Sequence, residues 1–127
     1  AQITNDPAMN LFEGEIVDIH LVLSPTIRLE LPPHLAALPR GRYTFGIRAS
    51  GITLDSAGFP FQIELAEISG SETFLHLQHE QVHVVGLLDS VQNFDIGQTV
   101  TAGIDSSALY AFDQSGNLVA SPYGGTK

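Results

Sequence analysis

Three histidines lie within one eight-residue stretch, and their spacing makes them the first candidates for chemistry. His76 and His79 precede the dipeptide Glu80-Gln81, and His83 follows it. If that dipeptide is the turn of a hairpin, Gln78 faces His83, and His76 and His83 form a diagonal pair roughly 7–8 Å apart on one strand face. Two imidazoles at that separation are near the reach of a shared metal ion, or form a pH-sensitive cluster.

The alternative for the three histidines is a partly exposed polar strand face without a ligand. Glu-Gln is a poor sequence for a two-residue hairpin turn, because neither residue favours a positive φ. A longer loop from His79 to Gln81 would change the register and scatter the imidazoles. The sequence favours the polar face and leaves the metal site as the second hypothesis.

The carboxylates are the other abundant groups, with 14 Asp and Glu in 127 residues. Glu13 and Glu15 alternate along a predicted first strand, and Asp18 follows them. This pattern suits a paired acid–base site, a calcium site, or the solvated face of an amphipathic strand. No second carboxylate cluster is linked to these residues by spacing, so the solvated face is the preferred interpretation.

Motifs of the well-known enzyme classes are missing. Nucleotide hydrolysis requires a glycine-rich loop that ends in Lys followed by Ser or Thr, but the single lysine is Lys127. There is no Gly-x-Ser-x-Gly elbow for a serine nucleophile and no cysteine for thiol or thiolate chemistry. We therefore predict that the chain is not an enzyme and holds no cofactor and no metal.

Charge excludes two classes of partner. The net charge is −9, from 5 Lys and Arg against 14 Asp and Glu. Binding of nucleic acid or of an anionic membrane surface depends on clustered Lys and Arg, so we predict neither. No apolar run approaches the roughly 20 residues that a membrane-spanning helix needs.

Short β-strands must position these residues, because the apolar pattern has period two almost throughout. In the longest run, 59–69, the interval from Leu65 to Ile68 indicates a bulge near Ala66. One helical turn is expected at Pro33–Leu38, with Pro33 at its first position. The predicted strands lie at Ile27–Leu31, Phe59–Ser69, Leu75–Leu77, Val82–Val84, Val100–Ile104 and Leu109–Phe112.

Turn sequences separate the predicted strands. Asp55-Ser56-Ala57-Gly58 and Asp113-Gln114-Ser115-Gly116 each begin with Asp and end with Gly, as type I turns prefer. The spacing of strands and turns predicts an all-β fold, an OB-type Greek-key barrel with a small additional β-sheet. We expect that sheet to contain the strands at Thr26–Leu31 and Arg42–Arg48.

Four segments, in the same order, resemble the C-terminal region of the ATPase subunits of carbohydrate-type ABC importers, such as those for maltose and glycerol 3-phosphate. That region contains the transport-associated OB (TOBE) domain. After Arg48 the chain has Ala49-Ser50 where the family often has Pro-Glu. The segments are DPAMNLFEGEI (6–16), GRYTFGIRASGITL (41–54), IELAEISGSETFLHL (63–77) and DIGQTVTAGIDSSALYAFDQSGNLV (95–119).

The resemblance implies an organisation for the chain. Residues 1–10 would be the remaining linker from an upstream ATPase domain, residues 11–120 the OB/TOBE-like barrel, and residues 121–127 a flexible tail. It also implies a regulatory and dimer-contact role, without catalysis in this piece. The candidate regulatory or interface residues within the matching segments are Arg48, Gly70, Ser71, Glu72, Phe112 and Asp113.

Partners and location follow from the same resemblance. The implied partners are a second copy of the subunit, the membrane subunits of the transporter through the ATPase domain, and a regulatory protein. ATP and magnesium would belong to the parent subunit. The implied location is the cytoplasm, peripheral to the inner face of the plasma membrane.

Two other functions compete with this one. The first is an OB module that binds a small ligand, an oxyanion or a sugar, through hydroxyls at Ser69–Ser71 and Asp105–Ser107, although the negative charge opposes anion capture. The second is a β-sandwich module for adhesion or carbohydrate binding, which would use aromatic platforms. The absence of Trp and the presence of only 3 Tyr disfavour the second.

Overall fold

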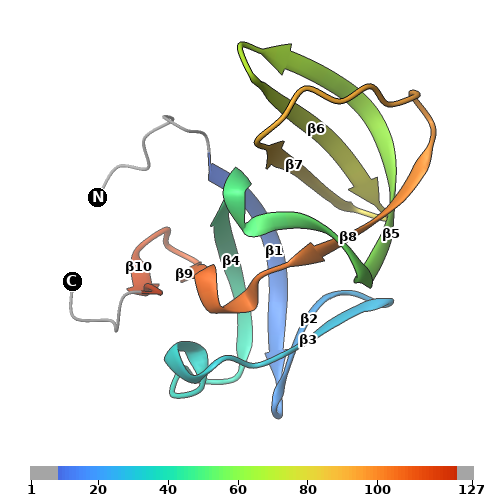
Figure 1. The fold of residues 1–127 in the computed structure, drawn as a ribbon. Coiled ribbons are helices and arrows are strands. Elements are labelled where there is room, and N and C mark those ends of the chain that lie inside the picture. The colour runs from blue at the N-terminus through green and yellow to red at the C-terminus, as the bar shows by residue number, and fades with distance from the viewer. Residues whose placement is uncertain (1–8, 123–127) are drawn as a thin grey trace. The chain divides into compact units, whose positions relative to one another are not determined.

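The computed structural model of the chain describes residues 9–122, except for the side chains of residues 55 and 56 (Figure 1). Most of the predicted linker and tail therefore lie outside the described residues. The chain divides into two compact units. The first unit contains the described residues up to 47 and from 106 onwards, and the second contains residues 48–105.

The first unit is built on one six-stranded sheet with the order β10-β9-β4-β1-β2-β3. Strict alternation in β1 places Phe12 and Ile16 in the core and turns Glu13 and Glu15 outward. Its strands are β1 (Met9–Val17), β2 (His20–Ser24), β3 (Ile27–Glu30), β4 (Gly41–Arg48), β9 (Tyr110–Phe112) and β10 (Leu118–Ala120).

The predicted helical turn is confirmed as a short 3-10 helix, η1 (Pro33–Leu35), with Pro33 at its beginning. Leu35 is fully buried in the first unit. The Nε2 atom of His34 lies 2.7 Å from the carbonyl oxygen of Leu109, which follows the 3-10 helix η3 (Ser106–Ala108). This hydrogen bond ties the η1 segment to the start of β9.

The second unit contains a curled four-stranded sheet with the order β7-β6-β5-β8 (Figure 1). Its apolar core comes from alternate residues on each strand, including Phe61, Ile63, Leu75, Leu77 and Val84. The unit begins with the 3-10 helix η2 (Ala49–Gly51), followed by β5 (Ile52–Ser69), β6 (Glu72–His79), β7 (Val82–Leu88) and β8 (Thr99–Ile104).

Close backbone approach within the second unit accompanies this curl. A Cβ atom on Gly86 of β7 would lie 3.2 Å from Cγ2 of Ile52, at the start of β5. The two strands are not neighbours in the sheet order, so the curl brings the edge strand back toward the beginning of β5. A side chain at position 86 would crowd Ile52, so glycine suits this position.

The pairing of strand β5 shifts register once against each of its two neighbours. Leu54 and Phe59 both face Ala102 of β8, so residues 55–58 form a bulge within β5 instead of ending the strand. A second register shift falls between Ile63 and Leu65. The bulge that the sequence predicts near Ala66 is therefore present, but its extra residue is Glu64.

The all-β, barrel-like part of the sequence prediction is confirmed, because both units are antiparallel sheets joined by turns and single 3-10 turns. The predicted composition of the additional sheet was wrong. Residues 27–30 and 41–48 belong to the same six-stranded sheet and are separated there by β1 and β2, whereas the second sheet comes from residues 52–104. Nowhere in residues 9–122 does a helix reach the length and apolarity that a bilayer crossing requires.

Candidate functional site

The β6–β7 hairpin has the register that places His76 and His83 on one face. Gln78 faces His83, and His79 faces Val82, so the turn consists of Glu80 and Gln81 alone. Glu80 takes a φ of +54°, and its carbonyl oxygen accepts a hydrogen bond from the Gln78 side chain at 3.1 Å. The two-residue turn that the sequence disfavoured is therefore the one formed.

Each of these two histidines is paired with its own glutamate from β5. The Nε2 atom of His76 lies 3.0 Å from Oε1 of Glu67, and Nδ1 of His83 lies 3.3 Å from Oε1 of Glu64. The side chain of Glu67 is 59% exposed, and that of Glu64 is 42% exposed. Each contact is a hydrogen bond, and it becomes an ion pair when the imidazole is protonated.

His79 does not join the other two histidines. Its Nδ1 atom lies 2.6 Å from the carbonyl oxygen of Pro60, and its ring lies 5.5 Å from the ring of Phe61, which belongs to the core. Within residues 9–122, no three His, Asp, Glu or Cys side chains are placed to hold a metal ion. Period-two alternation sends His79 to the opposite face, so it cannot join His76 and His83 as a third ligand.

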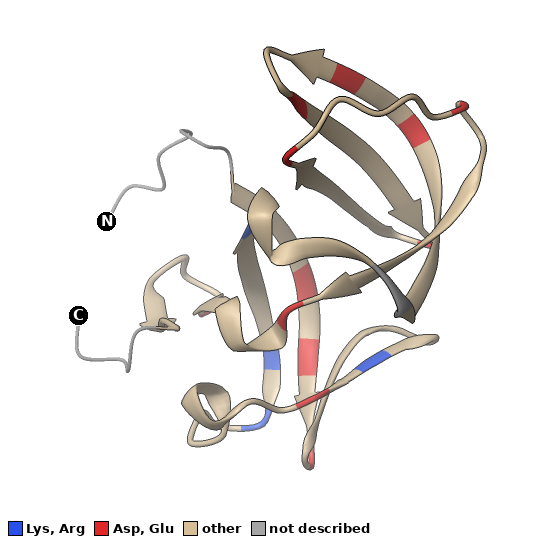
Figure 2. Ribbon diagram, in the orientation of Figure 1, with Lys and Arg blue, Asp and Glu red and all other residues tan. Residues whose placement is uncertain are grey.

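Sequence reasoning missed Glu64 and Glu67 as the partners of the histidines. Both lie inside the predicted 59–69 strand, and the bulge at Glu64 changes which of its residues share a face. The only sequence signal for these two partners is the break in period-two alternation that also indicates the bulge. Figure 2 shows the acidic positions along β5 and β6 and no Lys or Arg on either strand.

Gly70, Ser71 and Glu72 lie at the β5–β6 turn of the second unit. Ser69 pairs with Glu72, so Gly70 and Ser71 form a two-residue turn, and Gly70 has a φ of +63°. Glycine suits that position because it adopts positive φ without steric cost. Arg48, at the start of the same unit, is half-buried and directly precedes η2.

Phe112 and Asp113 lie in the first unit, at the end of β9. Phe112 is buried at 7% exposure and pairs with Thr44 of β4 and Leu118 of β10. A buried side chain of this kind stabilises the sheet and is not available to a partner. The six predicted interface residues thus divide between the two units: Arg48, Gly70, Ser71 and Glu72 in one, Phe112 and Asp113 in the other.

Asp113 organises the predicted type I turn that joins β9 to β10. Its carbonyl oxygen accepts a hydrogen bond from the backbone N–H of Gly116 at 3.0 Å. Its Oδ1 atom accepts bonds from the backbone N–H groups of Asn117 and Ser115, both at 2.9 Å. These donors, Asn117 first, hold the pKa of Asp113 below its ordinary value of 3.8.

Asp113→Asn is expected to lower the stability of the protein at neutral pH and to have a smaller effect in acid. Because the folded-state pKa of Asp113 is lowered, its contribution is present above pH 3.8 and is lost as the pH falls through the folded pKa. The stability difference between wild type and Asp113→Asn should therefore be constant from about pH 5 to 7 and shrink below pH 3.8. Urea titrations at each pH measure it. A stability difference between wild type and variant that grows in acid would contradict the lowered pKa of Asp113.

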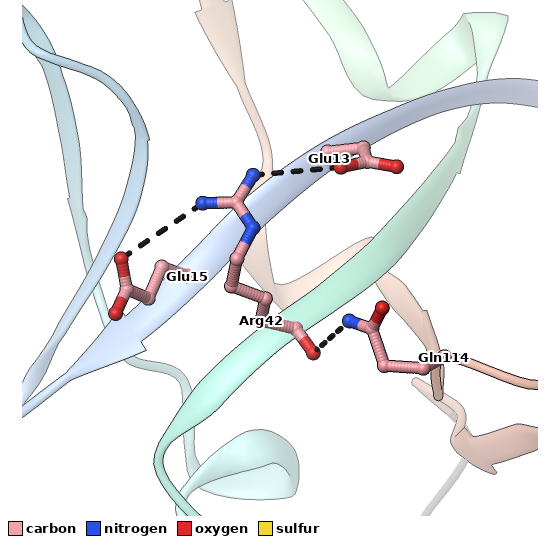
Figure 3. A network of polar contacts seen from close by, with 4 residues as sticks. All are labelled: Glu13, Glu15, Arg42 and Gln114. Atoms are coloured by element: carbon pink, nitrogen blue, oxygen red, sulfur yellow. Dashed lines mark hydrogen bonds and ion pairs between the residues drawn. The ribbon is translucent and has the colours of Figure 1, made fainter.

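Glu13 and Glu15 of β1 form ion pairs with Arg42 on the neighbouring strand β4. Arg42 Nη2 lies 3.4 Å from Glu13 Oε1, and Nη1 lies 3.9 Å from Glu15 Oε1 (Figure 3). Gln114 donates to the carbonyl oxygen of Arg42 at 2.9 Å. Asp18 lies in the β1–β2 turn with a φ of +54°. Such exposed ion pairs contribute about 0–1 kcal/mol, which agrees with a solvated strand face.

The comparisons with known proteins place this arrangement in context. No protein-family profile matches the chain. Over 123 residues, or 93% of its length, the chain is 28% identical to the sn-glycerol-3-phosphate import ATP-binding protein UgpC of Pectobacterium atrosepticum. It spans 34% of the length of that relative. The chain is thus similar to about one third of an import ATP-binding protein, which supports a relationship to that class of ATPase.

Proposed function

We propose that the chain is a non-catalytic accessory region, of the transport-associated OB (TOBE) type, from the C-terminal part of an ABC importer ATP-binding subunit. The transported solute would be glycerol 3-phosphate or a sugar. The observation that carries the proposal is the similarity over 93% of this chain to only 34% of an sn-glycerol-3-phosphate import ATP-binding protein. A region of that size leaves room for a separate ATPase domain in the parent.

The fold supports a role that does not handle nucleotide. Residues 9–122 form antiparallel sheets joined by tight turns, and the sequence has no glycine-rich loop ending in Lys-Ser or Lys-Thr. In the proposed parent, ATP and magnesium belong to the ATPase domain. This chain would supply surfaces for a second copy of the subunit and for a regulatory protein, at the cytoplasmic side of the membrane.

The physical logic of such a region is a shift in populations. A regulator alters an ATPase cycle only through a difference in its affinity for the open and closed states. Rigid sheet surfaces suit this role because a packed core moves between discrete arrangements instead of deforming continuously.

A chimera tests the proposal. The matching third of the Pectobacterium protein is replaced by this chain, and the subunit is reconstituted in vesicles with its own membrane subunits. We expect ATP-driven uptake of glycerol 3-phosphate at least severalfold above that of a subunit from which the same third is deleted. A folded chimera that performs no better than the deletion would contradict the proposal.

A further inference from the structure

The outward face of β5, β6 and β7 carries apolar side chains where solvated residues are expected. Register places Leu65, His76 and Val85 in one row across the three strands. The next row contains Glu67, Phe74 and Leu87. The opposite face of β6 holds the buried residues Leu75 and Leu77, so these rows belong to the side away from the core. We call them, with Glu64 and Glu72, the acidic face.

The apolar part of the acidic face is accessible. Leu65 is 43% exposed, and Phe74, Val85 and Leu87 are half-buried. A single exposed leucine is ordinary on a protein surface, but four apolar side chains in two adjacent rows form a contiguous patch. Patches of this kind, when polar groups surround them, mark sites of interaction with other proteins.

Charge distinguishes this patch from a generic apolar surface. Residues 48–105 contain 8 carboxylates, at positions 55, 64, 67, 72, 80, 89, 95 and 105, against the single cation Arg48 and no lysine. The difference, 1 minus 8, gives this unit a net charge of −7 with histidine neutral. Figure 2 shows acidic positions on β5 and β6 and no basic position on these strands.

The histidines position two of these carboxylates. His76 and His83 each contact one oxygen, Oε1, of Glu67 and Glu64 respectively. A carboxylate has about four acceptor positions, so each glutamate retains capacity for a further donor. A side chain already held in place loses less conformational entropy when a partner binds.

We propose that the acidic face binds a basic amphipathic segment of another protein. Apolar side chains of that segment would cover Leu65, Phe74, Val85 and Leu87. Its Lys or Arg residues would pair with Glu64, Glu67 and Glu72. Complementary charge selects this partner, because nucleic acid and anionic membranes would be repelled by a unit of this charge. The proposal rests on the surface of the second unit alone and is independent of the parent transporter.

The experiment uses the full chain, labelled with ¹⁵N, and a synthetic 14-residue amphipathic peptide of Leu and Lys as the probe. A Leu–Lys peptide of the same composition in scrambled order and a Leu–Glu peptide are the controls. Titration followed by amide chemical shifts gives both the location of binding and its Kd. We expect shifts centred on β5–β7 with the amphipathic peptide, at least about fivefold weaker binding of the scrambled peptide, and none with the Leu–Glu peptide.

Matched variants distinguish binding at the acidic face from non-specific attraction of a basic peptide to an acidic protein. Leu65→Ser should raise Kd about tenfold, and Glu64→Gln with Glu67→Gln about three- to tenfold. The controls Ile96→Ser and Asp95→Asn alter an exposed apolar residue and an exposed carboxylate of the same unit, outside the face. They should change Kd less than twofold. Undisturbed amide spectra of the free variants establish that each remains folded.

Four results would overturn the proposal. These are absence of binding at millimolar peptide, equal binding of the scrambled peptide, equal weakening by the control and face variants, and chemical shift changes centred outside β5–β7. Equal binding of the scrambled peptide would show that net charge alone, and not the amphipathic pattern, determines the affinity. Shifts centred on residues outside β5–β7 would place the interaction on another surface.

Discussion

Gly58→Ala is expected to lower the free energy of unfolding of the second unit by about 3 kcal/mol or more. A Cβ atom at this position would overlap the carbonyl oxygen of Ala102 and lie 2.7 Å from the backbone nitrogen of Gly103. Both are backbone atoms of β8, so a rotamer change cannot remove the contact. The bulge must move away from β8, and backbone hydrogen bonds beside it are lost.

Urea titration of the variant gives the change in unfolding free energy. Amide hydrogen exchange locates it, and the amides of Ala102 and Gly103 should lose protection first. Gly70→Ala is the matched control: the same methyl group is added at a positive φ of +63°, with no atom within 4 Å. Backbone strain alone should cost about 1–2 kcal/mol there. Equal costs at the two positions would show that contact with β8 is not the cause.

The strands were predictable from sequence because one face of each is buried. The alternation at Val100, Ala102 and Ile104 corresponds to β8 (Thr99–Ile104), and that at Val82 and Val84 to β7. Period-two burial is a strong signal because a shift of one residue would expose every apolar side chain of the strand. Pairing between distant strands has no such signal, and the composition of the second sheet was therefore mispredicted.

The β6–β7 turn shows how tertiary packing overrides local preference. A positive φ at Glu80 costs about 1–2 kcal/mol for a residue other than glycine. The resulting register keeps Leu77 opposite Val84, and both are at most 2% exposed. Burying each such side chain contributes about 1.5–3 kcal/mol. The burial outweighs the strain, and the turn sequence alone carries no information about that burial.

The acidic face was only partly visible in the sequence. The pairing of Gln78 with His83 follows from the hairpin and could be stated in advance as one of two registers. The contacts of Glu64 and Glu67 depend on the extra residue in β5 and on the adjacency of β5 to β6. A sequence pattern locates a bulge to within a few residues, but a shift of one residue decides which side chains face outward.

Leu21→Ala is expected to lower the free energy of unfolding of the first unit by about 2–5 kcal/mol. Leu21 is fully buried, and register places it between Ile16 of β1 and Leu29 of β3. Truncation to alanine removes packing from the middle of this row and leaves a cavity that three paired strands cannot easily close.

Leu11→Ala provides the matched control for Leu21→Ala, because the substitution is identical and Leu11 lies on the neighbouring strand β1 with 49% exposure. A half-exposed leucine loses little packing, and its truncation should cost about 1 kcal/mol or less. Both variants are compared with wild type by urea titration, with the dependence on denaturant fitted separately. If the two costs were equal, the core of the first unit would not lie on the side of β2 that carries Leu21. If only Leu21→Ala is costly, the inward face of β1, β2 and β3 is the one that holds the sheet together.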